Sequence, residues 1–282
     1  MANALAIRQA ARADPSIDAG VISDFEFLQH AVVAKGRVDK ALKRLRRIQA
    51  FKERYGIIRE GCLADAARDL KALLRLHPGF FLSMADTTTT AELEENDTLV
   101  PHRLPQLVCY KYKNFVGWKM RSEEALAILQ RACFYNVQAT CYSLPAIRGG
   151  LYFIADARGL TWQHFSMHAE VRLSELFTDS YPVRLYRISI LFASPIIRFF
   201  YAVMRSLINF KSGSKLQHLA TMYNYQESLV YHKTQGLSLD VVPVELGGRL
   251  VPEAFYDTVL QRLEERYKRV AKFRLPKEPQ SL

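Results

Sequence analysis

Residues 181–210 read YPVRLYRISILFASPIIRFFYAVMRSLINF, and this stretch indicates how the chain folds. Within it, residues 188–192 (ISILF) form a short apolar run that is typical of a buried strand. A Ser-Pro pair then predicts a turn, and residues 195–209 predict a helix that is apolar around almost its whole circumference. Arg198 and Arg205 interrupt that helix, and an arginine near the middle of a membrane span costs about 3 kcal/mol. We therefore interpret the stretch as strand, turn and helix, and not as a membrane span.

Strands and helices continue to alternate on the N-terminal side of this stretch and beyond it. Residues 106–112 (QLVCYKY) and 151–155 (LYFIA) predict strands, and residues 216–219 predict a further short one. Residues 122–140 between the first two predict a helix, because Ser122 precedes two glutamates in the first turn. This alternation predicts an α/β domain with a mainly parallel sheet.

The first third of the chain predicts a small helical unit. Apolar residues recur at helical spacing from residue 24 to Gly36, from residue 38 to Gly56, and again from residue 63 to His77. Four successive threonines and several acids follow within residues 86–96, which predicts a loop near a boundary. We expect an N-terminal helical unit over residues 1–85, the α/β domain over residues 98–252, and an amphipathic C-terminal helix and tail over residues 253–282.

Composition and charge narrow the class of partner. A hydrophobic fraction of 49% and a charged fraction of 24% are typical of a folded globular protein. The 39 Lys and Arg against 28 Asp and Glu leave a net charge of +11, which favours an anionic partner such as a membrane leaflet or nucleic acid. Nine basic residues lie within residues 35–54, and a solvated helix face explains that stretch about as well as a binding surface does.

The cysteines and the N-terminal segment bear on the compartment. The four cysteines have no paired spacing, so the sequence predicts neither a zinc knuckle nor a disulfide framework, and a reducing compartment follows. The first 14 residues carry two arginines and no acid before Asp14, which leaves mitochondrial targeting as the weaker alternative to a cytoplasmic location.

Catalytic signatures do not occur in the sequence. It contains no G-x-S-x-G elbow, no phosphate loop and no G-x-G-x-x-G. His164 and His168 are four residues apart, as metal ligands on one helical turn would be, but a third ligand is not evident. Asp156 ends a strand, and we interpret it as a hydrogen-bond acceptor in the following turn and not as a base. We expect no enzyme activity, no metal and no cofactor.

Five fragments in their order carry a family resemblance. Together they resemble the CRAL-TRIO family, which includes phosphatidylinositol-transfer, tocopherol-transfer and retinaldehyde-binding proteins. The resemblance implies an N-terminal helical unit packed on a lipid-binding domain, with a gate helix over an apolar pocket. The fragments are DFEFLQHAVVAKGRVDKAL (24–42), GGLYFIADARGL (149–160), YPVRLYRISILFASP (181–195), KLQHL (215–219) and VPVELGG (242–248).

The resemblance also implies where the ligands bind. Arg184 and Lys215 match positions that contact phosphoinositides in the family, whereas Val183 stands where the phosphatidylinositol-transfer branch has a glutamate. This departure favours a small hydrophobic cargo, with phosphoinositide phosphates at the pocket mouth. The expected phosphoinositide contacts are Arg184, Lys215, Arg187 and Lys211. The expected gate and pocket residues are Ile196, Phe199, Phe200, Val203, Met204 and Leu207.

The sequence thus predicts a cytoplasmic carrier that binds a hydrophobic ligand and associates peripherally with anionic membranes. One alternative is an interaction module that docks on membranes or signalling proteins without carrying cargo. A second alternative is RNA binding, suggested by the net charge and by tyrosines among lysines at residues 110–113. We rank RNA binding lower, because that segment also predicts a strand with packed tyrosines.

Overall fold

The computed structural model describes residues 1–57, 62–87, 105–176, 181–199, 201–202, 220–251 and 255–276. Its centre is a five-stranded sheet with the strand order β1-β2-β3-β4-β5. β1 pairs antiparallel with β2, and the other pairs are parallel. The predicted α/β fold with a mainly parallel sheet is therefore confirmed. The strands are β1 (Phe81–Asp86), β2 (Gln106–Lys111), β3 (Leu151–Asp156), β4 (Leu185–Leu191) and β5 (Ala220–Met222).

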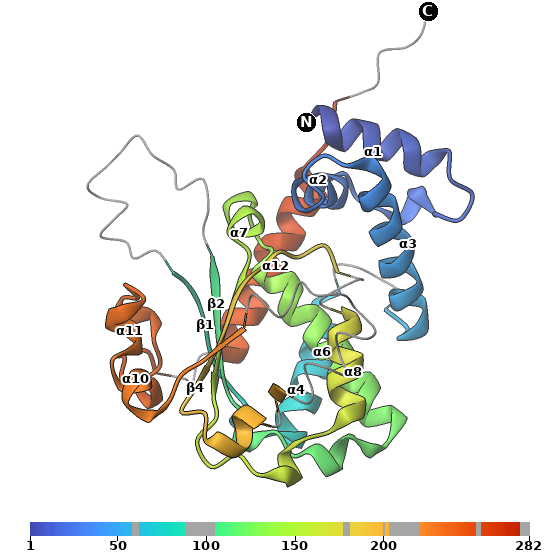
Figure 1. The fold of residues 1–282 in the computed structure, drawn as a ribbon. Helices are drawn as coiled ribbons and strands as arrows, with labels where there is room; N and C mark the ends of the chain where they lie inside the picture. Colours follow the sequence, from blue (N-terminus) through green and yellow to red (C-terminus); the bar gives the residue numbers. More distant parts are fainter. Residues whose placement is uncertain are drawn as a thin grey trace, which may run out of the picture.

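Helices cover both faces of the sheet. In Figure 1 the sheet is seen nearly edge-on, with α10 (Tyr225–Leu229) and α11 (Tyr231–Thr234) on its left. On the right lie the helices of the larger core. They are α4 (Leu63–Leu76), α6 (Glu123–Thr140), α8 (Met167–Glu175) and α12 (Phe255–Lys272). We call the two sides of the sheet the α6 face and the α11 face.

The strand registers show which residues belong to each face. Val108, Phe153 and Ile188 are aligned across β2, β3 and β4, and Tyr110 and Ile190 lie two residues further along on the same side. These side chains belong to the α6 face. The alternate residues belong to the α11 face, where they pack with Tyr231 and Leu246; they include Leu107, Cys109, Tyr152, Ile154 and Leu191.

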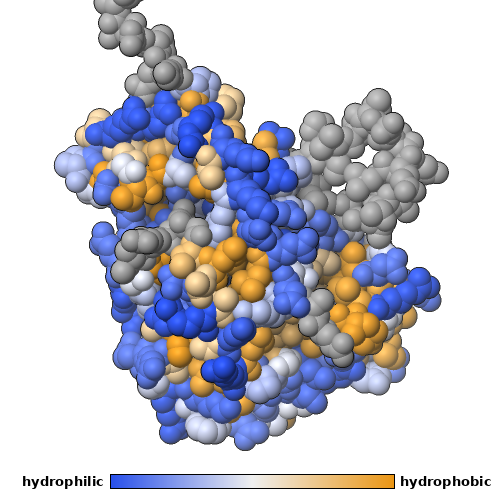
Figure 2. All heavy atoms as spheres, turned by 180° about the vertical axis from the view of Figure 1, so that it is seen from behind, coloured by the Kyte–Doolittle hydropathy of each residue, from blue (hydrophilic) through white to orange (hydrophobic). Residues whose placement is uncertain are grey.

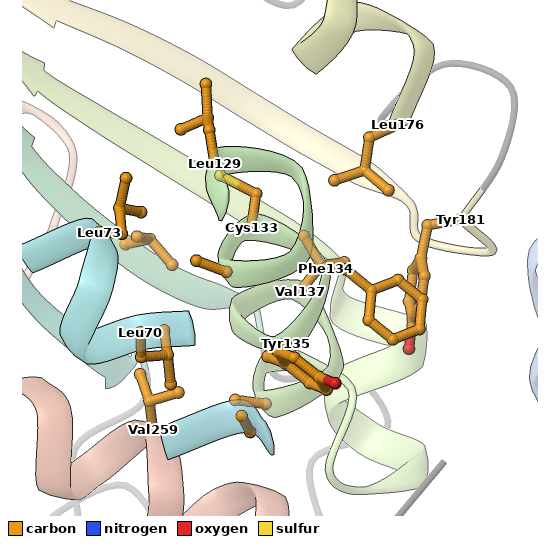
Figure 3. Close-up of a cluster of buried hydrophobic side chains, with 14 of the residues drawn as sticks. Leu70, Leu73, Leu129, Cys133, Phe134, Tyr135, Val137, Leu176, Tyr181 and Val259 are labelled. Atoms are coloured by element: carbon orange, nitrogen blue, oxygen red, sulfur yellow. The ribbon is translucent and has the colours of Figure 1, made fainter. Parts of the chain in front are cut away.

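The larger core lies between α4, α6 and α12 (Figure 3). Leu70 and Leu73 of α4 meet Leu129 of α6, and Val259 of α12 closes the cluster. Each of these four residues is at most 2% exposed. Complete burial of a leucine or valine side chain contributes about 1.5–3 kcal/mol. This cluster therefore stabilises the packing of the helices that cover the α6 face.

The N-terminal helices pack on α12 and on one another. α1 (Ala2–Arg12), α2 (Asp24–Val33) and α3 (Val38–Arg54) share a second apolar cluster, to which Leu275 also belongs. Ser23 caps α2, because its side chain accepts a hydrogen bond from the backbone of Glu26, and the Glu26 carboxylate accepts one from the backbone of Ser23. Leu275, which follows α12, therefore packs against the N-terminal helices, beside which α12 ends in Figure 1.

The remaining short elements connect the main ones. They are α7 (Leu144–Gly149), η1 (Ala19–Val21), η2 (Tyr112–Asn114), η3 (Gly117–Arg121), η4 (Trp162–His164), η6 (Leu239–Val241) and η7 (Val244–Leu246). Ser143 caps α7, and Ser122 caps α6 as the sequence predicts.

Two elements differ from the sequence analysis. β1 was not predicted as a strand, and it joins the sheet although it falls inside the expected helical unit of residues 1–85. The helix α1 was also not predicted, although its buried residues Ala4, Ile7 and Ala11 recur at helical spacing. Residues 216–219, predicted as a strand, lie outside the described residues, and the strand β5 begins at Ala220. Within the described residues, no helix is long and apolar enough to cross a membrane.

Candidate ligand cavity

The α6 face of the sheet is incompletely filled. Phe153, Ile188 and Ile190 lie on β3 and β4, which are paired on both sides, yet each of these side chains is only partly buried. On the α11 face of the same strands, Ile154 is 0% and Leu191 1% exposed. Protein interiors are packed without voids larger than a water molecule, so partly accessible apolar side chains on central strands indicate a space for another molecule.

Three polar groups lie next to these apolar side chains. Tyr110, Tyr112 and Glu170 are also partly accessible. Burial is nevertheless the main cause that raises the pKa of all three groups. Glu170 raises the pKa of Tyr112 further, whereas the hydrogen bond from Tyr112 opposes the rise in the pKa of Glu170. Groups that are desolvated but still accessible suit the wall of a ligand site. We call this apolar part of the α6 face, with its few polar groups, the candidate cavity.

The beginning of the predicted gate helix covers one side of the cavity. Residues 195–199 and 201–202 are helical, and we call them the gate segment. Ile197 is 6% exposed and packs with Ile190 and Met222 of the sheet. Tyr201, four residues later, is partly buried. It is close enough to Tyr110 to help raise the pKa of Tyr110, although burial and Glu170 have larger effects. Ile197 and Tyr201 thus form the inner side of the gate segment.

The outer side of the gate segment is apolar too. Ile196 and Phe199, three residues apart, are 65% and 68% exposed. These two residues were expected among those that form the gate and pocket, and the structure turns them away from the cavity. Ile197 and Tyr201 were missed, although their spacing of four residues is typical of one helical face. Phe200, Val203, Met204 and Leu207 lie outside the described residues.

An exposed apolar surface continues from the gate segment onto α10. Arg198 forms an ion pair with Glu227 of α10 at 3.9 Å. Tyr225, Leu229 and Val230 in and after α10 are each at least 50% exposed. Figure 2 shows apolar residues in patches across the middle of the molecule and towards the right, the side on which α10 lies.

Two tryptophans are exposed at the end of the sheet where β2, β3 and β4 have their carboxyl ends. Trp118 in η3 is 59% exposed and Trp162 in η4 is 61% exposed. Together they line a surface hollow of about 640 Å³. Gly117 holds the two segments close together, because a Cβ atom there would lie 2.3 Å from the carbonyl oxygen of Phe165.

The expected phosphoinositide contacts do not all lie together. Arg184 is exposed directly before β4, and its backbone carbonyl accepts a hydrogen bond from Leu151. Arg187 lies on the α11 face, where its guanidinium is 5.8 Å from the centre of the Tyr152 ring and donates a hydrogen bond to Gln235. Side-chain alternation along β4 therefore places Arg187 on the face opposite the cavity. Lys211 and Lys215 lie outside the described residues.

The candidate acid and metal residues have structural partners. Asp156 is 0% exposed and accepts hydrogen bonds from the backbone and the guanidinium of Arg158, as expected for a turn acceptor. His164 accepts a hydrogen bond from the backbone of Thr161 and precedes α8, so it does not share a helix with His168. Within the described residues, no group of three His, Cys, Asp or Glu could hold a metal ion.

The basic stretch of residues 35–54 is the helix α3. Ala41, Leu45, Ile48 and Phe51 form its buried side. Two of the charges contact neighbouring segments: Arg46 pairs with Asp14 after α1, and Lys52 pairs with Glu26 of α2 at 3.1 Å. At least part of this charge therefore serves helix packing.

Comparison with known protein families gives the identity of the domain. A family model described as the CRAL/TRIO domain matches residues 107–248, half of the chain. These residues include β2 to β5, α6, α8 and the gate segment, and thus every described residue of the cavity named above. None of the curated proteins matches the chain.

Proposed function

Since the chain belongs to the CRAL/TRIO domain family, whose members bind lipophilic ligands, we propose that it holds a hydrophobic small molecule or lipid in the cavity on the α6 face and exchanges it at a membrane surface. The observation that carries this proposal is the partial exposure of Phe153, Ile188 and Ile190 on the central strands. The protein is a carrier and not an enzyme. It acts in the cytoplasm and associates peripherally with membranes.

The outer surface of the gate segment supports exchange at a bilayer. Ile196 and Phe199 already present apolar area to water, and burial of that area is worth about 25 cal/mol per Å². Trp118 and Trp162 add side chains that favour the interface between lipid and water. A bilayer that receives these residues stabilises an open gate, which water alone does not.

Phosphoinositide contacts at the mouth form the finer part of the proposal. Arg184 is exposed directly before β4, and it matches, together with Lys215, positions that contact phosphoinositides in the family. We propose Arg184, Lys215 and Lys211 as the contacts at the mouth. We do not include Arg187 in this group, because it lies on the α11 face.

Lipid extraction and mass spectrometry of the purified protein test the carrier function. Wild type should contain, or accept from vesicles, one ligand per chain. Ile190→Trp should reduce this occupancy because it fills the cavity, whereas Tyr186→Trp, an exposed site on the same strand, should not. A folded wild-type protein that accepts no ligand and transfers none between vesicles contradicts the proposal and favours the interaction module without cargo.

Vesicle binding tests the mouth and the docking surface separately. Arg184→Ala combined with Lys215→Ala should weaken binding to phosphoinositide vesicles more than it lowers ligand occupancy. Equal loss of both would place these residues inside the pocket.

The chain has two tryptophans and both are exposed, so docking should shift the tryptophan fluorescence emission to shorter wavelength. No shift upon binding to vesicles would show that this end of the molecule stays in water.

A further inference from the structure

Glu170 is an acidic side chain on the wall of an otherwise apolar cavity. It belongs to α8, and the Tyr112 hydroxyl donates a hydrogen bond to its Oε1 atom. Aromatic rings surround this pair. The ring centres of Tyr112 and Phe165 are 5.8 Å apart, those of Tyr112 and Tyr110 are 6.0 Å apart, and Tyr110 in turn contacts Phe153.

The fold does not account for a carboxyl group at this position. Among the described residues, no cation forms an ion pair with Glu170, and Tyr112 is its one hydrogen-bonding side chain. Burying a polar group without its hydrogen bonds costs about 1–3 kcal/mol, so an apolar residue would stabilise the empty protein more. The second carboxyl oxygen still has the capacity for a hydrogen bond to a molecule in the cavity.

The chemistry of the wall restricts that molecule. A phosphate or carboxylate head group would be repelled by an ionised Glu170 and would have no described cation to pair with. A hydroxyl group suits either protonation state of the carboxyl group, because it can donate to a carboxylate oxygen or to the carbonyl oxygen of a carboxylic acid, which an ether cannot do. The flanking rings of Tyr110 and Phe165 suit the apolar carbon atoms next to that hydroxyl.

We propose that Glu170 and Tyr112 bind the hydroxyl group of a lipophilic alcohol whose hydrocarbon part lies along Phe153, Ile188 and Ile190. This inference rests on the proposed carrier function and names the ligand class of the same cavity. Glu170 determines specificity, and Tyr112 orients its carboxyl group. Loss of the polar partner leaves a hydroxyl group unpaired in an apolar site, which should weaken binding of the alcohol by about tenfold.

Competitive loading tests the proposal with three probes of one chain length: oleyl alcohol, its methyl ether and oleylamine. Each is offered in phosphatidylcholine vesicles, and occupancy is measured by extraction and mass spectrometry. Wild type should prefer the alcohol to the ether by about tenfold. Tyr112→Phe, which removes one oxygen and keeps the ring, and Glu170→Leu should both remove that preference while the ether still binds.

Glu264→Leu on the exposed side of α12 is the matched control and should keep the preference. Equal uptake of alcohol and ether by wild type overturns the hydroxyl site but leaves the carrier function intact. Preferred uptake of oleylamine also overturns it, since the carboxylate then pairs with a cation. Uptake of none of the probes contradicts both the carrier function and this site. If Tyr112→Phe folds but binds none of the probes, Tyr112 maintains the shape of the cavity, and its proposed role in orienting Glu170 is wrong.

Discussion

His30 is a buried histidine in α2. It is 1% exposed, and its Nδ1 atom has no hydrogen-bond partner among the residues that the structure describes. Burial lowers its pKa from 6.5 to about 3, against an opposing effect of Glu26, and Arg44 and Lys52 lower it further. The folded protein therefore keeps this histidine neutral over a pH range in which the unfolded chain protonates it.

The pH dependence of stability follows from this shift. As pH falls below 6.5 the unfolded state binds the proton first, so the free energy of unfolding decreases, by about 2 kcal/mol at pH 5 for this one group. His77, whose pKa burial lowers to about 4, acts in the same direction. The difference between the urea midpoints at pH 7 and pH 5 should be smaller in His30→Gln than in wild type. In His168→Gln, at an exposed position, this difference should be the same as in wild type. An unchanged loss of stability at pH 5 in His30→Gln would contradict this assignment.

Gly150 controls how closely the chain before β4 approaches β3. Its φ is +85°, and a Cβ atom there would lie 2.5 Å from the carbonyl oxygen of Arg184. Gly150→Ala should lower the free energy of unfolding by roughly 3 kcal/mol and also weaken phosphoinositide binding, because Arg184 must move. Gly56, with φ of +64° and no atom within 4 Å, isolates the backbone effect. Gly56→Ala should cost only about 1–2 kcal/mol. If Gly150→Ala and Gly56→Ala lower the free energy of unfolding equally in urea denaturation, the close approach of Gly150 to Arg184 does not contribute.

The gate segment has two apolar sides, and substitutions on them should differ in kind. Ile197 faces the sheet, whereas Phe199 faces water at 68% exposure. Phe199→Asp should leave the melting temperature nearly unchanged and slow transfer between vesicles, because the charge opposes entry into the bilayer. Ile197→Asp should lower both stability and ligand occupancy, because it buries an unpaired carboxylate at a cost of several kcal/mol.

The comparison needs a control for charge alone. Thr221→Asp places the same charge on the exposed side of β5 and should affect neither transfer nor occupancy. If Phe199→Asp unfolds the protein as Ile197→Asp is expected to, the segment is ordinary core, and the transfer mechanism loses its moving part. Phe200, its neighbour, lies outside the described residues.

At the scale of the whole molecule, Arg266 connects the C-terminal helix to the N-terminal helices and to the core. It is 1% exposed, and it donates hydrogen bonds to the carbonyl of Cys141 at 2.8 Å and to Gln29 at 2.9 Å. Gln29 in turn donates to the carbonyl of Pro182 at 3.0 Å, just before β4. Three segments far apart in the sequence are thus joined at one buried cation.

Arg266→Ala should therefore destabilise the entire protein and not one unit of it. Loss of a buried, hydrogen-bonded charge leaves its partners unsatisfied and costs about 3 kcal/mol or more. Circular dichroism should show one unfolding transition at lower temperature. Lys268→Ala, two residues away on the exposed side of α12, should change the melting temperature little. Two separate transitions in Arg266→Ala would show that the N-terminal helices and the sheet unfold independently.

The sequence alone determined the features that depend on neighbouring residues. The helical spacing in α2, α3, α4 and α12 and the apolar runs in β2, β3 and β4 were predicted correctly because each period repeats within a few residues. The family was recognised because five short fragments occur in one order, and the CRAL/TRIO match confirms it. The turn role of Asp156 was also predicted, since its partner Arg158 is two residues away.

Tertiary structure alone decided the features that depend on distant parts of the chain. β1 carries no decisive pattern of its own and became a strand by pairing with β2. Arg187 was assigned to the mouth from its position in the sequence, and the alternation of β4 placed it on the other face. The Tyr112–Glu170 pair spans 58 residues, so local spacing could not predict it. Such contacts form only when folding brings their elements together.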